Sequence, residues 1–218
     1  MPGPSVDQWC LVVPVKRLAL AKTRLAEVAG EHRVDLALAF ALDTATAALA
    51  CDVVRAVIVV TNEPDAARAL TDIGALVVSD EPDAGLNPAL VHGANVASRA
   101  HPGTALGALS ADLPALRPDE LSAALAAAPA TGTAFVRDAQ GSGTTTLLAR
   151  RPGDFAPAFG PESATAHLLG GAVELHGDAF PSLRRDVDTA DDLEQAIAMG
   201  VGTHTAAVAR RLSQVGCR

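Results

Sequence analysis

The amino-acid sequence predicts an α/β fold: a doubly wound, mostly parallel sheet with an inserted antiparallel hairpin. Two observations support this prediction. Apolar, strand-like runs alternate with helix-like runs up to Ala128, the order typical of a parallel sheet covered by helices. From Thr133 onward two strand-like runs follow each other, joined by a glycine-bearing segment. A chain of 218 residues can bury roughly 70% of the surface that it exposes when unfolded, so we expect one domain over residues 1–218.

The first half of the chain carries the clearest strand and helix patterns. Trp9–Val15 is apolar throughout, and Val53–Thr61 is β-branched and nearly continuous, as expected of strands buried on both faces. Glu31–Leu49 has apolar residues at helical spacing and predicts a long amphipathic helix. The remaining predictions here are a helix over Pro64–Asp72, a strand over Ala75–Ser79, a helix from about Asn87 to Ala100, a strand over Ala105–Ser110 and a helix over Pro118–Ala128.

The second half predicts the hairpin and a shorter set of elements. Thr133–Arg137 and Thr144–Ala149 are the two hairpin strands. Phe159–Leu169 is a loop that enters a short helix, with Ser163 as its N-cap. The rest is predicted as short strands over Val173–Leu175 and Leu183–Val187, and helices over Ala190–Met199 and Thr203–Leu212.

Composition excludes several classes of function. A formal net charge of -8 and a pI near 5.1 argue against a nucleic-acid-binding surface, which needs a basic stripe. The three cysteines lie far apart, so neither a disulfide framework nor a Cys-type zinc site is predicted. The six histidines lack metal-ligand spacing, and no G-x-S-x-G elbow of a serine hydrolase occurs. Apolar runs are short and interrupted by charges, so we expect a cytoplasmic protein.

A basic segment follows the first strand. It carries four cations within nine positions: Lys16, Arg17, Lys22 and Arg24. The carboxyl end of a first strand is where an open α/β sheet binds a polyphosphate. No glycine occurs between Gly3 and Gly30, which argues against both the dinucleotide-binding turn and the P-loop. These side chains would therefore hold phosphates directly; the alternative is a solvated positive loop.

Three aspartates lie at or beyond predicted strand ends. Asp112 follows the strand over 105–110, at the edge where such sheets bind ligands. Asp186 and Asp188 project to one face of an extended segment, where they repel each other unless a cation lies between them. Together the three offer hard oxygen ligands suited to Mg²⁺. The alternative for Asp112 is an ordinary turn residue. Beyond the pair, we interpret Thr189 as a helix N-cap.

Two glycine-bearing segments could bind a small anion. They are Gly141–Thr145 and Phe159–Ser163, in which backbone N–H groups and the hydroxyls of Thr144 and Ser163 would face a phosphate or carboxylate. Taken alone, these residues are better explained by a hairpin turn plus an N-cap, because both sets are ordinary turn chemistry. Asn87 precedes a proline at a helix start, where it would act as an N-cap or read a nucleobase edge.

In this order the segments resemble the guanylyltransferases that activate a phosphorylated three-carbon acid in the biosynthesis of the deazaflavin coenzyme F-420. The resemblance covers nearly the whole chain. Its motifs are individually weak but fairly specific in their ordered combination. Ser110-Ala111 departs from related transferases, where a glycine is common, and Ser142 departs from some hairpin patterns. The matching segments are Pro14–Lys16, Ala21–Leu25, Gly85–Asn87, Asp112–Pro114, Gly143-Thr144, Phe159-Gly160, Ser163, His167 and Asp186–Thr189.

The resemblance implies a Rossmann-like nucleotidyltransferase fold of the nucleotide-diphospho-sugar transferase type, a three-layer sandwich. It implies transfer of GMP from GTP to the phosphate of phosphoenolpyruvate or 2-phospho-L-lactate, with release of pyrophosphate. The same resemblance implies the roles of the site residues. Asp112, Asp186 and Asp188 would bind Mg²⁺, and Thr144, Gly160 and Ser163 would bind the acceptor acid. The nucleotide would be bound by Lys16, Arg17, Lys22, Arg24 and Asn87, of which Lys16, Lys22 and Arg24 would also act in catalysis.

Two other functions fit the residues. One is a nucleotidyltransferase for a sugar phosphate or molybdopterin, and the other is a non-catalytic nucleotide-binding module. The Ala-rich composition favours phosphoenolpyruvate only indirectly, through a high-GC bacterial source. The guanine preference follows from the resemblance alone. The last helix either makes a homodimer contact or covers the sheet, and the product could pass to a downstream transferase.

Overall fold

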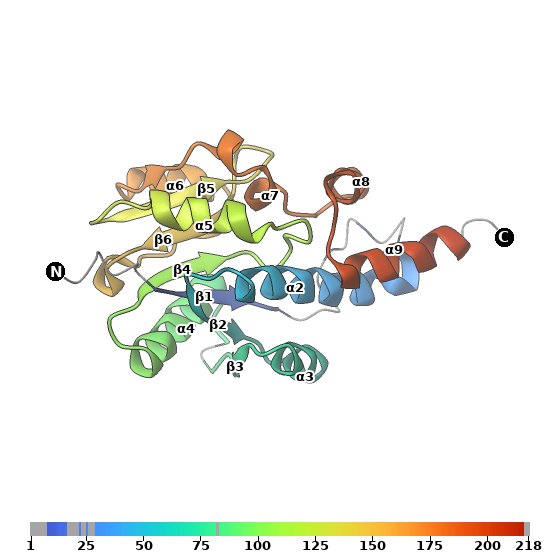
Figure 1. The fold of residues 1–218 in the computed structure, drawn as a ribbon, viewed down its shortest axis with the longest axis horizontal. Coiled ribbons are helices and arrows are strands. Elements are labelled where there is room, and N and C mark those ends of the chain that lie inside the picture. Colours follow the sequence, from blue (N-terminus) through green and yellow to red (C-terminus); the bar gives the residue numbers. More distant parts are fainter. Residues whose placement is uncertain (1–7, 17–21, 23–24, 26–28, 82, 216–218) are drawn as a thin grey trace.

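The computed structural model describes residues 8–16, 22, 25, 29–81 and 83–215. Helices cover both faces of a seven-stranded sheet, which gives three layers (Figure 1). The strand order is β3-β2-β1-β4-β6-β5-β7. The strands are β1 (Trp9–Pro14), β2 (Val54–Val60), β3 (Leu76–Val78), β4 (Ala105–Leu109), β5 (Thr133–Arg137), β6 (Thr144–Ala149) and β7 (Val173–Glu174).

The sheet is mostly parallel, as the sequence predicts. Among the described strands, only β6 runs against its neighbours, pairing antiparallel with both β4 and β5. The predicted hairpin is therefore confirmed, and its second strand is the one inserted beside β4. The parallel pairs are β1 with β2, β1 with β4, β2 with β3 and β5 with β7.

Helices divide between the two faces of the sheet. The main ones are α2 (Arg33–Leu49), α3 (Pro64–Asp72), α4 (Leu86–Ala100), α5 (Pro118–Ala127), α6 (Ser163–Leu169), α7 (Pro181–Arg184), α8 (Ala190–Met199) and α9 (Thr203–Val215). Residues of α2, α3, α5 and α7 share one apolar cluster, whereas α4 and α6 contribute to the cluster on the opposite face. Three short 3-10 turns complete the described elements: η3 (Gly30–His32), η4 (Pro152–Asp154) and η5 (Gly177–Ala179).

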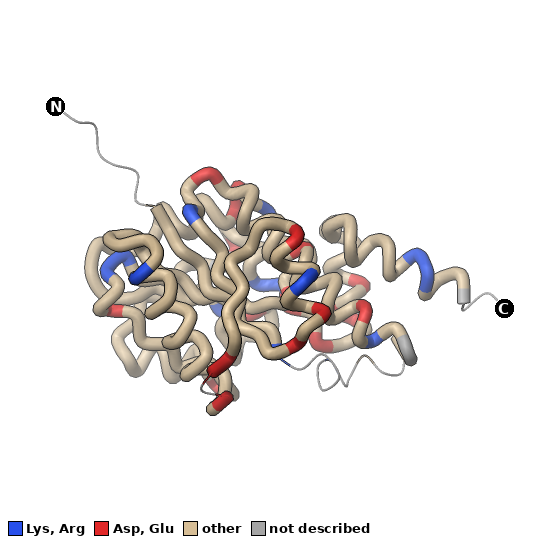
Figure 2. The backbone as a smooth tube through the Cα atoms, turned by 90° about the horizontal axis from the view of Figure 1, so that it is seen from below, with Lys and Arg blue, Asp and Glu red and all other residues tan. Residues whose placement is uncertain are grey.

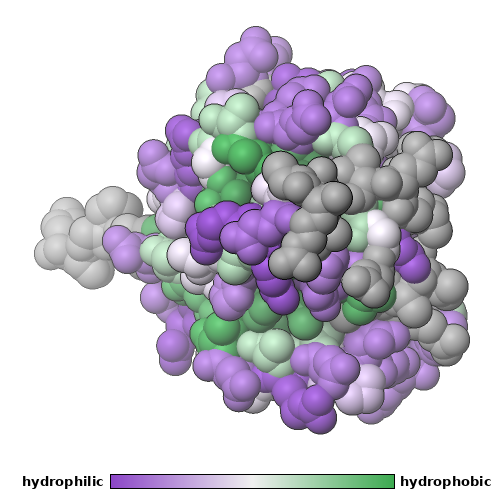
Figure 3. All heavy atoms as spheres, turned by 90° about the vertical axis from the view of Figure 1, so that its right-hand side faces the viewer, coloured by the Kyte–Doolittle hydropathy of each residue, from purple (hydrophilic) through white to green (hydrophobic). Residues whose placement is uncertain are grey.

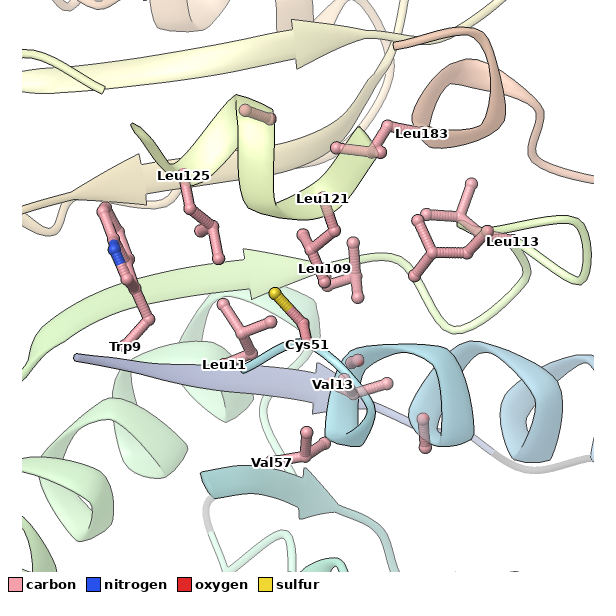
Figure 4. Packing of buried hydrophobic residues seen from close by; sticks show 14 of the residues in the cluster. Trp9, Leu11, Val13, Cys51, Val57, Leu109, Leu113, Leu121, Leu125 and Leu183 are labelled. Carbon is pink, nitrogen blue, oxygen red and sulfur yellow. The ribbon is translucent and has the colours of Figure 1, made fainter. Parts of the chain in front are cut away.

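Strand β1 lies at the centre of the core because β2 and β4 flank it and helices cover both of its faces. Leu11 and Val13 share one apolar cluster with the leucines of α5 (Figure 4), while Val12 belongs to the cluster that contains residues of α4. Gly93 allows α4 to approach this closely, since a Cβ there would lie 2.5 Å from Val12 Cγ1. Burial on both faces explains the continuous apolar sequence of the strand.

Helices α8 and α9 form a third cluster beside α2. Phe40 of α2, Leu193 of α8 and Val208 of α9 are buried in it. The buried Asp43 carboxylate accepts hydrogen bonds from the backbone N–H groups of His204 and Thr205, which fixes the start of α9 on α2. Among the described helices, none is long and apolar enough to cross a membrane. In the part of the chain that the structure describes, acidic and basic residues are scattered along the backbone (Figure 2).

Several predicted elements differ from the structure. The strand predicted over Leu183–Val187 is wrong: α7 ends at Arg184, and the following segment pairs with no strand. Pro181 starts this helical turn, and Ser182 secures it through hydrogen bonds from its N–H and hydroxyl to Glu120. The predicted N-caps Asn87 and Ser163 lie inside their helices, because α4 is preceded by Gly85 and α6 by Glu162. Thr189 does cap α8, in a capping box with Asp192.

Candidate active site

The site lies at the sheet edge toward which β1 and β4 run. Parallel neighbours end at the same edge, so Lys16, after β1, and Asp112, after β4, come together there. Figure 3 looks onto this side of the molecule, where hydrophilic residues cross the middle of the face between hydrophobic areas. A pocket of about 280 Å³ opens here, lined by Pro14, Val15, Lys16, Lys22, Ala37, Ala41, Leu86, Ser110, Ala111 and Asp112.

The three predicted aspartates are neighbours in the structure. The backbone N–H of Val187 donates to the carbonyl of Asp112, at 3.1 Å, and this bond ties the segment after α7 to the loop after β4. Val187 itself is fully buried in the cluster beside α2. Because side chains of an extended segment alternate, anchoring Val187 in the core leaves Asp186 and Asp188 beside Asp112. Asp112 and Asp188 both contact Lys22, and their charges act on the carboxyl group of Asp186, while a role of the three in binding Mg²⁺ stays a prediction.

Lys22 is the cation of this cluster. Its ammonium group donates to Asp112 and, at 2.7 Å, to Asp188 Oδ1. Burial acts to lower the pKa of Lys22, but the two carboxylates outweigh burial and hold this pKa above its usual value. Lys22 is therefore charged and fixed, with a side chain only 11% exposed. Lys16 lines the adjoining pocket, while Arg17 and Arg24 lie outside the described residues.

Asp186 is the carboxyl group that Lys22 leaves without a direct partner. Burial, followed by the charges of Asp112, Asp188 and Asp138, raises the pKa of Asp186 to about 7. Its Oδ1 atom is buried without a hydrogen-bond partner among the described residues. An ionised carboxylate in this position is costly, so the cluster favours binding either a proton or a further cation.

A complete metal site is not already assembled. Within the part of the chain that the structure describes, no three His, Cys, Asp or Glu side chains are arranged to hold a metal ion. Lys22 lies between two of the three aspartates that the sequence assigns to Mg²⁺. A divalent cation bound to Asp112 and Asp188 would compete with the Lys22 ammonium group for their oxygen atoms.

A second polar centre lies between the hairpin and α6. Thr144 begins β6 and Ser163 begins α6, and both are buried. The backbone N–H of Ala164 donates to the carbonyl of Ser142, at 3.1 Å, which holds the hairpin against the helix. Gly160, in the loop before α6, has φ +145°, a backbone conformation that favours glycine. The structure thus brings together the three residues predicted to bind the acceptor.

The hairpin turn itself does not present free N–H groups to an anion. The Asp138 carboxylate accepts hydrogen bonds from the N–H groups of Gly141, Ser142 and Gly143, at 2.6, 3.0 and 2.8 Å. The expectation that these glycine N–H groups approach a substrate is therefore wrong, and the turn interpretation holds. The sequence carries a signal for this arrangement, because Asp138 stands directly before the turn, a position typical of residues that bond their own backbone.

Asn87 connects α4 to the acceptor loop. Its amide nitrogen donates to the Phe159 carbonyl, at 2.9 Å, and its amide oxygen accepts from the Phe159 N–H, at 2.8 Å. One amide hydrogen and one oxygen lone pair remain available. A contact between Asn87 and a nucleobase stays a prediction; what the structure shows is that Asn87 positions Phe159 and, with it, Gly160.

The fold is similar to that of nucleotidyl transferases. A nucleotidyl transferase from Methanothermobacter thermautotroptrophicus superposes with a TM-score of 0.62 at 19% identity, covering 88% of this chain and 97% of that one.

The family follows from the sequence comparisons. The model of the family described as "Guanylyl transferase CofC like" matches residues 9–215. A phosphoenolpyruvate guanylyltransferase of Thermomonospora curvata is 59% identical over 205 residues, 94% of this chain and 90% of the relative. One of Streptomyces coelicolor is 55% identical over 210 residues, 96% of this chain and 99% of the relative. The chain belongs to the CofC-like guanylyl transferase family.

Proposed function

We propose that this protein transfers GMP from GTP to the phosphate of phosphoenolpyruvate, with release of pyrophosphate, as a step in coenzyme F-420 biosynthesis. The relatives that are more than half identical in sequence carry the name of this activity. The observation that carries the proposal in the structure is the cluster of Lys22 with Asp112 and Asp188 at the edge of β1 and β4. A separate polar centre at the buried Thr144 and Ser163 would bind the second, anionic substrate.

The nucleotide phosphates belong on the side of Lys16 and Lys22 in this proposal. Lys16 lines the pocket at the end of β1, and Lys22 is charged at its rim. Arg17 and Arg24, from the same basic segment, complete the set of cations by sequence position. Lys16, Lys22 and Arg24 would stabilise the charge that develops on the α-phosphate and on the departing pyrophosphate.

Asp112, Asp186 and Asp188 would hold a divalent cation, which we propose to be Mg²⁺. Their chemistry fits, because carboxylate oxygens are the hard ligands that Mg²⁺ prefers and Asp186 Oδ1 is buried without a partner. When bound, the ion supplies positive charge close to the substrate phosphates. Binding requires Asp186 to be ionised and the Lys22 ammonium group to leave the aspartates. The displaced ammonium group would then be free to contact the triphosphate.

Thr144, Gly160 and Ser163 would position the acceptor acid. An oxygen of its phosphate attacks the α-phosphorus of GTP, a new P–O bond forms, and the bond to the β-phosphate breaks with its electron pair leaving on pyrophosphate. A phosphate monoester has a second pKa of about 6 and is mostly dianionic at neutral pH, so no proton has to be removed from the nucleophile. The residues therefore act by positioning and by neutralising charge rather than by general base catalysis.

The test is to incubate the protein with GTP, Mg²⁺ and single acceptors while following pyrophosphate. The acceptors are phosphoenolpyruvate, 2-phospho-L-lactate, 3-phosphoglycerate, a sugar 1-phosphate and molybdopterin. We expect pyrophosphate and a GMP adduct in the mass spectrum with phosphoenolpyruvate; including the downstream transferase traps a labile product. Turnover only with a sugar phosphate or molybdopterin contradicts the proposal, and GTP binding without any turnover indicates a non-catalytic module.

Two further expectations go with this proposal. Both substrates are cytoplasmic metabolites, so we expect the reaction in the cytoplasm. A homodimer formed through α9 would double the mass of the protein in solution, which light scattering measures.

A further inference from the structure

We propose that His167 is a positioning residue that fixes the hydroxyl of Thr144 as a hydrogen-bond donor toward the anionic acceptor. This inference rests on the proposed function, which places the acceptor acid at Thr144. His167 belongs to α6, one turn after Ser163, and only 3% of its surface is exposed. It has no direct part in the chemistry proposed above.

The hydrogen bonds of His167 determine which ring nitrogen carries the proton. The backbone N–H of Ala158 points at Nε2 from 3.0 Å. A backbone amide can only donate, so Nε2 must present its lone pair. The neutral ring then carries its hydrogen on Nδ1. Burial lowers the pKa of His167, and a hydrogen bond with the Ser163 backbone offsets part of this effect. The lowered pKa agrees with a neutral ring.

This tautomer sets the direction of the bond to Thr144. Thr144 Oγ1 lies 2.9 Å from His167 Nδ1. Because Nδ1 bears the hydrogen, the threonine oxygen must accept, and the threonine hydrogen is left for another partner. Among the described residues no other hydrogen-bond acceptor contacts this hydroxyl. A hydroxyl that already accepts from histidine can offer an added ligand its hydrogen, which suits a carboxylate or phosphate oxygen.

Aromatic neighbours hold the imidazole in this orientation. Its centroid lies 5.7 Å from that of Phe135 and 5.3 Å from that of Phe159, whose ring meets it edge-on at 78°. The backbone of Phe159 is in turn held by both polar atoms of Asn87. Turning the ring over would cost the bond from Ala158 and disturb this packing. A contact chain therefore runs from Asn87 through Phe159 and His167 to Thr144.

The chemical consequence is selectivity for an anionic oxygen at Thr144. A freely rotating hydroxyl accepts or donates equally well, whereas this one is fixed as a donor. A hydrogen bond to a charged group contributes more than one to a neutral group. We therefore expect the amide or methyl ester of the acceptor acid to bind more weakly than the acid, and this preference to depend on His167.

The experiment compares two replacements that each keep one half of the imidazole. In His167→Asn the side-chain NH₂ lies near the position of Nδ1 and can still donate to Thr144. His167→Gln places its amide near Nε2 instead, so the donor to Thr144 is lost. We expect His167→Gln to raise the KM for phosphoenolpyruvate about tenfold or more, the effect of one charge-assisted hydrogen bond, with little change in the KM for GTP. His167→Asn should recover most of this loss.

Two controls separate positioning from folding. His176→Gln changes an exposed histidine and should leave both KM values unchanged. In Thr144→Val the group through which His167 acts is gone, so adding His167→Gln should raise the KM for the acid no further. Equal effects of His167→Gln on both substrates, or additive effects with Thr144→Val, would overturn the inference.

Nitrogen NMR of the wild-type imidazole provides a readout that needs neither turnover nor a folded variant. We expect a hydrogen on Nδ1 and none on Nε2 at neutral pH. A hydrogen on Nε2, or a doubly protonated ring, would overturn the inference. Failure of the wild type to use phosphoenolpyruvate while the Nδ1–H form is present would instead count against the proposed function.

Discussion

Lys22 donates hydrogen bonds to both Asp112 and Asp188, which follow it in the chain by 90 and 166 positions. One ammonium group thereby joins the basic segment after β1 to the acidic groups after β4 and α7. Among the described residues, Lys22 is the cation that contacts these carboxyl groups, and the pKa of Asp186 rises to about 7 as a result of burial and of the neighbouring charges. The cluster is therefore deficient in positive charge at neutral pH, as expected of a site that binds a further cation.

Replacing Lys22 by Met should separate its role in turnover from its competition with a metal ion for the aspartates. We expect turnover to fall by about two orders of magnitude, the typical loss for a group that stabilises a developing charge. Binding of Mn²⁺ without nucleotide should tighten, because no ammonium group competes for Asp112 and Asp188. Titration calorimetry measures the second effect.

Arg68→Met is the matched control, since it removes an exposed cation paired with Asp65 on α3 and should change neither quantity. If Lys22→Met leaves turnover, the KM for GTP and the affinity for Mn²⁺ at wild-type values, the role assigned to Lys22 is wrong.

Asp112→Asn and Asp188→Asn should each lower turnover by two or more orders of magnitude, at about the cost of losing a key electrostatic group. Each change keeps the side-chain volume but removes a charge that contacts Lys22. Asp191→Asn is the control from the same segment; Asp191 lies exposed in the first turn of α8, where its charge only favours the helix end. Near-normal pyrophosphate release by both test variants would contradict the assignment of Asp112 and Asp188 as metal ligands.

The sequence predicts the positions of these groups better than their contacts. Continuous apolar runs locate β1 and β4, and strand ends then place Lys16 and Asp112 at one edge. The pairing of Lys22 with Asp112 depends on how distant segments pack, which no local pattern encodes. The strand predicted at Leu183–Val187 is wrong for a related reason: Leu183 and Val187 are buried, but Pro181 and Ser182 start a helical turn that includes Leu183.

The contribution of Asp186 to the stability of the metal-free protein should fall as pH rises from about 4 to about 7. The unfolded chain loses the proton of Asp186 near its ordinary pKa of 3.8, whereas the folded protein keeps it up to about 7. Between these values the unfolded state binds fewer protons, so raising the pH favours unfolding, and the effect levels off above pH 7. Melting temperatures of the wild type and of Asp186→Asn across this range measure it.

The difference in stability between the wild type and Asp186→Asn isolates the contribution of the Asp186 carboxyl group. We expect Asp186→Asn to gain stability relative to the wild type as pH rises to 7, and to keep that gain above it. Addition of a divalent cation should stabilise the wild type more at pH 8 than at pH 6, because the ion binds the ionised carboxylate. A constant difference between the two proteins at every pH would show that the pKa of Asp186 is not raised.

Gly143→Ala should weaken both the hairpin and the acceptor site. A Cβ at Gly143 would overlap Asp138 Oδ2, which accepts the hydrogen bond from the Gly143 N–H. Relieving the overlap moves the carboxylate from the three N–H groups that it holds, and we expect a loss of about 1–3 kcal/mol in the free energy of unfolding. Thr144 is the next residue, so the KM for the acid should rise more than the KM for GTP.

Gly153→Ala is the control, because a Cβ at Gly153 has no atom within 4 Å. Urea unfolding and steady-state kinetics measure the two effects, and equal stability of the two variants would show that Asp138 does not require glycine at position 143.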